Sequence, residues 1–332
     1  MSGAALLAVD DLARAFTAPP GLRWLLRGGA RPMVRALNGV TLAVARGETL
    51  AVVGESGCGK STLARALVRL IEPDSGQIVF DGEDVRGLSG QALRRYNRRV
   101  QMVFQDPYGS LNPRMTVGEI LAEALRVHRL VPPSGLAARV AELLVLVRLP
   151  ADAAGRLPHQ FSGGQRQRVA IARALSVEPE LLVADEIVSA LDVSVQAQIL
   201  NLLLDLQERL GLAILFVSHD LRVVRHIAHR VAVMYLGRVV ELGPAEAVFG
   251  QPLHPYTQAL LRAAPAMEPP PDGQRPQAGA AALAGELPSP LAIPPGCPFH
   301  PRCPAARADC AELVPRVHVA AGGHMATCHL LG

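Results

Sequence analysis

The chain has 332 residues and a formal net charge of +4, and its residues are 50% hydrophobic, 4% aromatic and 19% charged. This composition excludes wholesale disorder, and the length corresponds to about two domains at roughly 150 residues each. The small positive excess and the scarcity of aromatic residues disfavour nucleic-acid binding. The longest apolar runs, residues 143–147 and 212–217, are much shorter than the ~20 residues of a membrane span, and residues 1–11 lack a signal-peptide pattern, so we expect a cytoplasmic chain.

The region from residue 48 to residue 71 predicts a phosphate-binding loop. A buried strand over 48–54 leads into Gly54-Glu-Ser-Gly-Cys-Gly-Lys-Ser-Thr62 and then into a helical run over 63–71, which is the order that the G-x-x-x-x-G-K-[ST] motif requires. The glycines permit a backbone whose N–H groups converge on one anion at the positive end of the helix. Lys60 is expected to reach the β and γ phosphates of a nucleotide and Ser61 to bind Mg²⁺. The predicted nucleotide-binding residues of this loop are Gly54, Glu55, Ser56, Gly57, Cys58, Gly59, Lys60, Ser61 and Thr62.

Two further predicted strands end in residues suited to catalysis. The strand over 180–185 ends in Asp185 and is followed by Glu186. Carboxyl ends of parallel strands meet at one edge of a sheet, so both carboxylates are expected beside the glycine loop. Asp185 would hold Mg²⁺, and Glu186 would polarise the water that attacks the γ-phosphorus. The strand over 213–217 leads to His219, which taken alone is either a polar strand end or a catalytic group.

The run Phe161-Ser-Gly-Gly-Gln-Arg-Gln-Arg168 resembles the signature motif of ATP-binding cassette (ABC) ATPases. The resemblance implies an α/β P-loop NTPase fold with a helical subdomain and a C-terminal extension rich in proline and cysteine. It also assigns roles to single residues, and for two of them a purely structural interpretation remains open. Phe16 would stack on adenine or belong to the core, and Gln105 would be the Q-loop residue that binds Mg²⁺ or would face solvent. Asp192 would belong to the D-loop, and His219 would contact the γ-phosphate.

The signature run has a physical logic of its own. Ser162 is a suitable N-cap for the following helix, and Gly163 with Gly164 exposes the first N–H groups of that helix to an anion. The phosphate loop already takes the phosphates of the chain's own nucleotide, so this second helix end needs a phosphate from elsewhere. In the family, Ser162, Gly163, Gly164 and Gln165 would bind ATP held by an opposing subunit, and hydrolysis would open the resulting dimer.

Finer resemblance extends over nearly the whole chain. The runs 101–118, 188–198 and 254–261 resemble the ATPases of oligopeptide and dipeptide permeases, and the insertion over 17–35 resembles their second ATP-binding subunit. The family implies a nucleotide-binding domain over 1–250, with its helical subdomain at about 106–160, and an extension over 251–332. The expected partners are a paralogous ATP-binding subunit or a second copy, two transmembrane permease subunits and, indirectly, an extracytoplasmic solute-binding protein, at the cytoplasmic face of the inner membrane. Nickel, opine or oligosaccharide uptake and a soluble cassette ATPase remain alternatives.

Four of the five cysteines lie at the end of the chain, in the spacing Cys297-x5-Cys303-x6-Cys310-x17-Cys328. Disulfides are disfavoured in a reducing compartment, so four thiolates indicate a metal site. Zinc sites usually contain tight cysteine pairs, which are missing, so the spacing favours a [4Fe-4S] cluster, as some peptide-permease ATPases carry. Zinc, with His300 or His324, and free thiols are the alternatives. The cluster would pin a proline-rich arm that follows a linker over 263–295.

One position departs from the family pattern. Proline usually follows the catalytic glutamate, whereas this chain has Ile187. Isoleucine leaves φ free and adds an N–H, so we expect a looser orientation of Glu186, with ATP binding unaffected. Because Glu186 and His219 both remain, we still expect an active site. A nucleotide-binding partner with little turnover is a further alternative.

Overall fold

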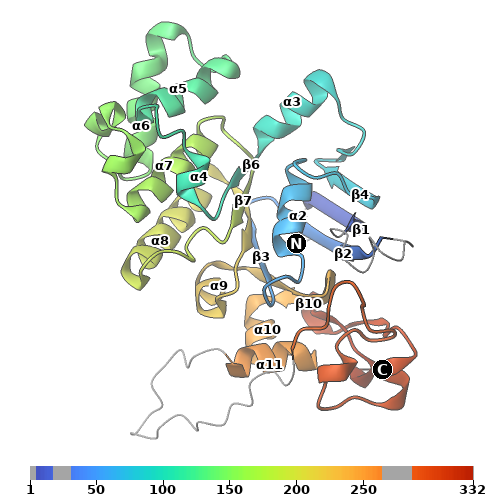
Figure 1. Ribbon diagram of the computed structural model, residues 1–332. Helices are drawn as coiled ribbons and strands as arrows, with labels where there is room; N and C mark the ends of the chain where they lie inside the picture. The colour runs from blue at the N-terminus through green and yellow to red at the C-terminus, as the bar shows by residue number, and fades with distance from the viewer. Residues whose placement is uncertain (1–4, 18–30, 264–285, 332) are drawn as a thin grey trace, which may run out of the picture. The chain divides into compact units, whose positions relative to one another are not determined.

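The computed structural model describes residues 5–17, 31–263 and 286–331 (Figure 1). Most of the insertion expected over 17–35 and of the linker expected over 263–295 lies outside these residues. The chain divides into two compact units: the first is formed mainly by Asp81–Val217 with Val44–Thr49, and the second by Leu7–Ala43, Leu50–Phe80 and the chain from Ser218 onward. Among the described helices, none combines the length and the apolar character that crossing a membrane requires.

Three parallel strands form the centre of the first unit. The strand β7 (Leu181–Asp185) pairs with β6 (Val100–Val103) on one side and with β8 (Ala213–Val217) on the other. Every residue of β7 and β8 is buried, as expected for parallel strands that are covered on both faces. The strands predicted over 180–185 and 213–217 are confirmed.

Helices make up most of the rest of the first unit. The helix α5 (Val117–Val127) begins with a capping box in which Thr116 accepts from the N–H of Glu119 and the Glu119 carboxylate accepts from the N–H of Thr116. This helix and α6 (Leu136–Leu146) lie within the segment at about 106–160 in which a helical subdomain is expected. The remaining elements are β5 (Glu83–Asp84), α3 (Gly90–Arg99), α4 (Pro107–Ser110), η1 (Pro133–Gly135), η2 (Ala151–Gly155), η3 (Pro158–Gln160), α7 (Gly163–Leu175) and α8 (Val193–Leu210).

The second unit contains strands of two sheets. The strand β3 (Thr49–Val53) is fully buried and runs parallel to β9 (Arg230–Tyr235), which forms a hairpin with β10 (Arg238–Pro244). Leu236 and Gly237 both have positive φ, which suits a tight hairpin turn. In the other sheet, β1 (Ala5–Thr17) lies between β2 (Met33–Ala45) and β4 (Ser75–Phe80). The helix α2 (Lys60–Leu67) follows β3 and ends before the predicted residue 71.

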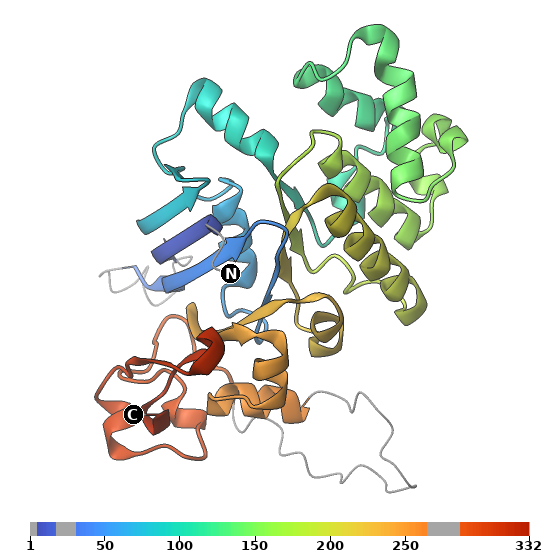
Figure 2. The same cartoon turned by 180° about the vertical axis from the view of Figure 1, so that it is seen from behind.

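The C-terminal segment, residues 286–331, extends the first of these sheets. The strand β12 (Met325–Thr327) pairs with β10, and β11 (Val317–Val319) pairs with β12. Figures 1 and 2 both show this segment, in red, beside the orange helices α10 (Ala245–Gly250) and α11 (Pro255–Ala263). The other elements of this unit are α9 (Leu221–Ile227), η4 (His300–Arg302), η5 (Ala308–Ala311), η6 (Ala321–Gly323) and η7 (His329–Leu331).

Candidate active site

The predicted site residues belong to two groups, one in each unit. The second unit carries Phe16, the phosphate loop and His219, and the first unit carries Gln105, the signature run, Asp185, Glu186 and Asp192. The four cysteines predicted to hold a cluster also belong to the second unit. Each group has a local geometry that bears on what it can bind.

The phosphate loop owes its path to glycine at two positions. Gly54 and Gly59 have φ of 149° and 109°, values that residues with a side chain rarely adopt. A Cβ atom at Gly54 would lie 2.2 Å from the carbonyl oxygen of Met234, and one at Gly59 would lie 2.2 Å from that of Ala36. No side chain caps the start of α2, so its first N–H groups remain suited to an anion. The loop therefore fits a nucleotide's phosphates.

Lys60 lies within the loop. The residue is only 4% exposed. Its Nζ donates to the carbonyl oxygens of Gly54 at 2.8 Å and Glu55 at 3.0 Å. These contacts keep the ammonium group among the loop's backbone. The neighbouring Cys58 is buried, and burial raises the pKa of its thiol, so it is a neutral packing residue rather than a reactive thiolate.

Glu55 makes contacts that the sequence analysis missed. Its carboxylate accepts from both terminal nitrogens of Arg302, at 2.7 and 2.9 Å, and its N–H donates to Tyr256 Oη at 2.9 Å. The rings of Tyr235, Tyr256 and Phe299 pack around this point, with centroids 4.7 to 5.4 Å apart. Arg302 lies between Cys297 and Cys303 in the motif Gly-Cys-Pro-Phe-His-Pro-Arg-Cys-Pro. As the one arginine of that motif, it is the sequence feature that could have pointed to an ion pair.

Phe16 and His219 occupy less buried positions in the same unit. Phe16 lies on β1 and is half-buried, with the Arg14 guanidinium 4.9 Å from its ring centroid. Arg14 in turn pairs with Asp74 at 2.6 Å. His219 is exposed just before α9, whose N-cap is Asp220.

In the first unit, Glu186 is held by its backbone and by its side chain. Its φ is 49°, its N–H donates to Val217 O at 3.0 Å, and its carbonyl oxygen accepts from Ser189 Oγ at 2.9 Å. Its carboxylate accepts from Gln105 Nε2 at 3.0 Å. The preceding residue, Asp185, is 4% exposed at the end of β7. The first unit thus brings Gln105 and Glu186 into direct contact.

A cavity of about 300 Å³ lies beside these residues. Ile187, which is 2% exposed, lines it together with Gln105 and Gln167. Gln167 is fully buried, and neither its Oε1 nor its Nε2 has a hydrogen-bond partner among the described residues. A buried amide without hydrogen bonds lowers the stability of the folded state, so Gln167 is expected to be destabilising at this place beside the cavity.

The signature run begins α7 as predicted. Ser162 is the N-cap: its Oγ accepts from the N–H of Gln165 at 3.3 Å, and the Gln165 Oε1 accepts from the N–H of Ser162 at 3.0 Å, which completes a capping box. The reason for glycine at 164 includes packing, because a Cβ there would lie 2.3 Å from Val195 Cγ1. Asp192 caps α8 by accepting from the N–H of Val195 at 2.9 Å, and this bond lowers the pKa of Asp192.

The prediction of an iron–sulfur cluster is wrong. Within residues 5–17, 31–263 and 286–331, no group of three or more His, Cys, Asp or Glu side chains could hold a metal ion. Cys297, Cys303, Cys310 and Cys328 are free thiols. Burial is the main cause that raises the pKa of the thiols of Cys297, Cys303 and Cys328.

The histidines of the zinc alternative are also engaged elsewhere. His300 Nδ1 lies 2.9 Å from the carbonyl oxygen of Cys297, and His324 Nε2 lies 2.7 Å from Glu241 Oε1. Within the described part of the chain, no group of side chains supports a zinc site either.

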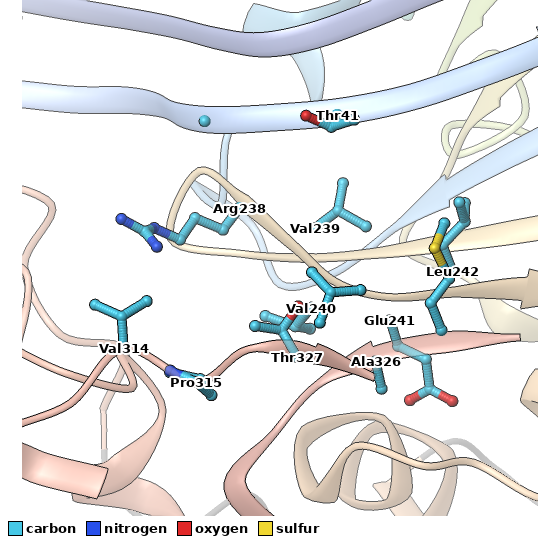
Figure 3. Close-up of a pocket in the computed structure, with 13 residues that line it drawn as sticks. Thr41, Arg238, Val239, Val240, Glu241, Leu242, Val314, Pro315, Ala326 and Thr327 are labelled. Carbon is cyan, nitrogen blue, oxygen red and sulfur yellow. The ribbon is translucent and has the colours of Figure 1, made fainter. Parts of the chain in front are cut away.

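A separate pocket of about 270 Å³ lies against β10 (Figure 3). It is lined by Thr41 of β2, by Arg238 and its successors on β10, and by Val314 and Pro315 of the C-terminal segment. None of the predicted site residues lines it. This pocket is therefore distinct from the phosphate loop.

Comparisons with known proteins agree on one family. The model of the ABC transporter family matches residues 37–189, and that of the oligopeptide/dipeptide transporter C-terminal region matches residues 240–310. The chain is 51% identical to the oligopeptide transport ATP-binding protein AppF of Bacillus subtilis, over 90% of each chain. It is 50% identical to the di/tripeptide transport ATP-binding protein DppF of Pseudomonas aeruginosa, over 95% of this chain and 94% of that protein. A dimeric ATP-binding cassette solved after hydrolysis, with ADP and phosphate, is 28% identical with a TM-score of 0.62, over 72% of this chain and 98% of that one.

Proposed function

The chain belongs to the family of ABC transporter ATPases, and we propose that it is the ATP-hydrolysing subunit of a peptide importer. The observation that carries this proposal is the combination, in one chain, of a phosphate loop and a signature helix with a C-terminal region of the oligopeptide/dipeptide transporter type. Relatives that are half identical over nine-tenths of the chain transport oligopeptides or di- and tripeptides, which supports peptides as the solute.

The chain's own residues would divide the reaction as follows. The N–H groups of the phosphate loop and Lys60 would bind the phosphates of ATP, with Phe16 against the adenine. Ser61, Gln105 and Asp185 would hold Mg²⁺, which neutralises charge on the phosphates during transfer. Glu186 would accept a proton from the attacking water, and His219 would contact the γ-phosphate. The contact between Glu186 and Gln105 supports this division, since it joins the proposed base to a proposed Mg²⁺ ligand.

The signature helix would act on a second subunit. Ser162, Gly163, Gly164 and Gln165 would bind the γ-phosphate of ATP held by a paralogous subunit or by a second copy, while Asp192 would lie in the dimer interface. The dimeric form of a solved relative supports this arrangement. The subunits would work with two transmembrane permeases, supplied by a solute-binding protein, at the inner face of the membrane. We place the nucleotide-binding domain at 1–250, with a helical part at about 106–160, and the extension at 251–332.

The proposal is tested by ATP hydrolysis in the purified complex with its permeases. Glu186→Gln removes the base, and we expect hydrolysis to fall by a factor of 10² to 10⁴ while Mg-ATP drives stable dimers. Glu142→Gln, on an exposed pair with Arg139, is the matched control and keeps the wild-type rate. Addition of peptides with the binding protein should raise the rate, whereas stimulation by nickel chelates, opines or oligosaccharides alone would reassign the solute. A wild-type rate equal to that of Glu186→Gln would contradict hydrolysis by this chain.

A further inference from the structure

The ion pair between Glu55 and Arg302 has the geometry of a strong contact. The two hydrogen bonds, at 2.7 and 2.9 Å, run in parallel from the guanidinium to the carboxylate. Such a bidentate pair fixes orientation as well as distance. The Arg302 side chain is 5% exposed and that of Glu55 is 22% exposed, so water weakens the pair little. The pairing raises the pKa of Arg302, which keeps the guanidinium charged.

Tyr256 holds the main chain of the same residue. Its hydroxyl oxygen accepts from the Glu55 N–H at 2.9 Å, and the residue is 0% exposed. Burial raises the pKa of Tyr256, so the phenol remains neutral and its position is set by the packed rings. Glu55 is therefore held by its backbone and by its side chain, in both cases from beyond residue 250.

Ring packing and hydrogen bonds anchor the C-terminal segment that carries Arg302 on the same unit. Phe299 packs against Tyr256, and its carbonyl oxygen accepts from the N–H of Arg302 at 2.9 Å. Glu241, which is 1% exposed on β10, accepts from the N–H groups of Leu253 and His254 at 2.8 and 2.9 Å and pairs with His324 at 2.7 Å. These contacts give Arg302 a fixed base from which to act on the loop.

We propose that Arg302 is a positioning residue for nucleotide binding, through which the C-terminal segment holds the phosphate loop in its anion-binding conformation. The inference rests on the proposed function, because it takes ATP as the ligand of the loop. A loop with three glycines at positive φ loses much conformational freedom when it is ordered. A loop ordered in advance binds its ligand more tightly, since that cost does not fall on the binding step.

The test compares four full-length variants in the complex by the KM and kcat of ATP hydrolysis and by the Kd of a fluorescent ATP analogue. Arg302→Met keeps the length of the side chain and removes the charge, and we expect KM and Kd to rise about tenfold with kcat changed less than twofold. Arg302→Lys keeps the charge but not the two parallel hydrogen bonds of the guanidinium, and its KM and Kd should lie between those of the wild type and Arg302→Met. Arg307→Met is the matched control, because Arg307 pairs with the exposed Asp309 within the C-terminal segment, and it should leave both constants unchanged. Lys60→Ala should abolish analogue binding.

The outcomes separate the two proposals. A folded Arg302→Met variant with wild-type KM and Kd overturns the positioning role, provided that Lys60→Ala has lost binding. A Lys60→Ala variant that binds the analogue like the wild type overturns the proposed function instead. If Arg302→Met does not fold, Arg302→Lys decides: a raised KM with little change in kcat supports the positioning role, and an unchanged KM overturns it. Restoration of KM by the double change of Glu55→Arg with Arg302→Glu supports the pair itself.

Discussion

Buried His254 should make the free energy of unfolding depend on pH between about 4 and 6.5. The residue is 1% exposed, its Nδ1 accepts from the N–H of Tyr256 at 3.0 Å, and burial lowers its pKa from 6.5 to about 4. The unfolded chain therefore binds a proton at this site between pH 6.5 and pH 4, and the folded chain does not. Stability from this group is complete above pH 6.5 and is lost as the pH falls toward 4.

The size of the effect follows from the two pKa values. At about 1.4 kcal/mol for each tenfold change in proton affinity, the difference amounts to about 3 kcal/mol lost between pH 7 and pH 4. His254→Asn keeps an acceptor for the Tyr256 N–H but does not titrate. Packing lost beside Phe299, whose ring centroid lies 5.8 Å from that of His254, lowers its stability equally at every pH. The slope of stability against pH is therefore the decisive quantity.

Urea unfolding at pH 7, 6, 5 and 4 measures that slope. We expect the wild-type free energy of unfolding to fall by about 3 kcal/mol more than that of His254→Asn across this range. His318→Asn, which changes an exposed histidine on β11, is the control and should run parallel to the wild type. Parallel curves for wild type and His254→Asn would refute the assignment of a buried neutral imidazole.

Three further changes test local features of the two units. Gly59→Ala places a Cβ 2.2 Å from a carbonyl oxygen and should abolish binding of a fluorescent ATP analogue, whereas Gly57→Ala, which meets no atom within 4 Å, should weaken it less; equal losses would contradict the steric argument. Thr116→Ala removes the cap of α5 and should lower the free energy of unfolding by about 1 kcal/mol in urea, with Thr116→Ser close to wild type. Gln167→Met replaces an unpaired buried amide and should raise that free energy by about 1 kcal/mol; a loss of similar size would show that the amide is paired in solution.

The sequence predicted local structure well where a single physical feature, such as a continuous apolar run or a capping residue, determines it. Continuous apolar runs located β3, β7 and β8, because strands buried on both faces leave no polar alternation. The predicted end of α2 at residue 71 is too late, because apolar residues continue to Ile71 whereas the last i to i−4 hydrogen bond is that of the Val68 N–H. Ser162 could be identified as an N-cap from its residue type, but the reciprocal bond from Gln165 came only with the structure.

The contacts that carry the further inference could not be read in the same way. Glu55 and Arg302 are 247 residues apart, and no periodicity or motif spacing links them. The cysteine pattern failed for a related reason: spacing counts residues along the chain and does not report whether their side chains form a metal-binding group, and the described residues form none. In the structure the N–H of Cys297 donates to the carbonyl oxygen of Cys310 at 2.8 Å, so part of that spacing serves a backbone contact.

The glycines of the two anion-binding motifs differ in what they make room for, and this difference bears on how the signature helix is positioned. In the phosphate loop, glycine avoids main-chain carbonyls, so substitution distorts the loop itself. At Gly164 the neighbour is Val195, a side chain in the first turn of α8, and the N–H of Val195 is held by the cap of Asp192. The first turns of α7 and α8 therefore pack closely at Gly164 and Val195, and a side chain at 164 would need Val195 to move. Because Asp192 caps the turn that carries Val195, the predicted D-loop and signature motif are linked through one packing contact within the first unit.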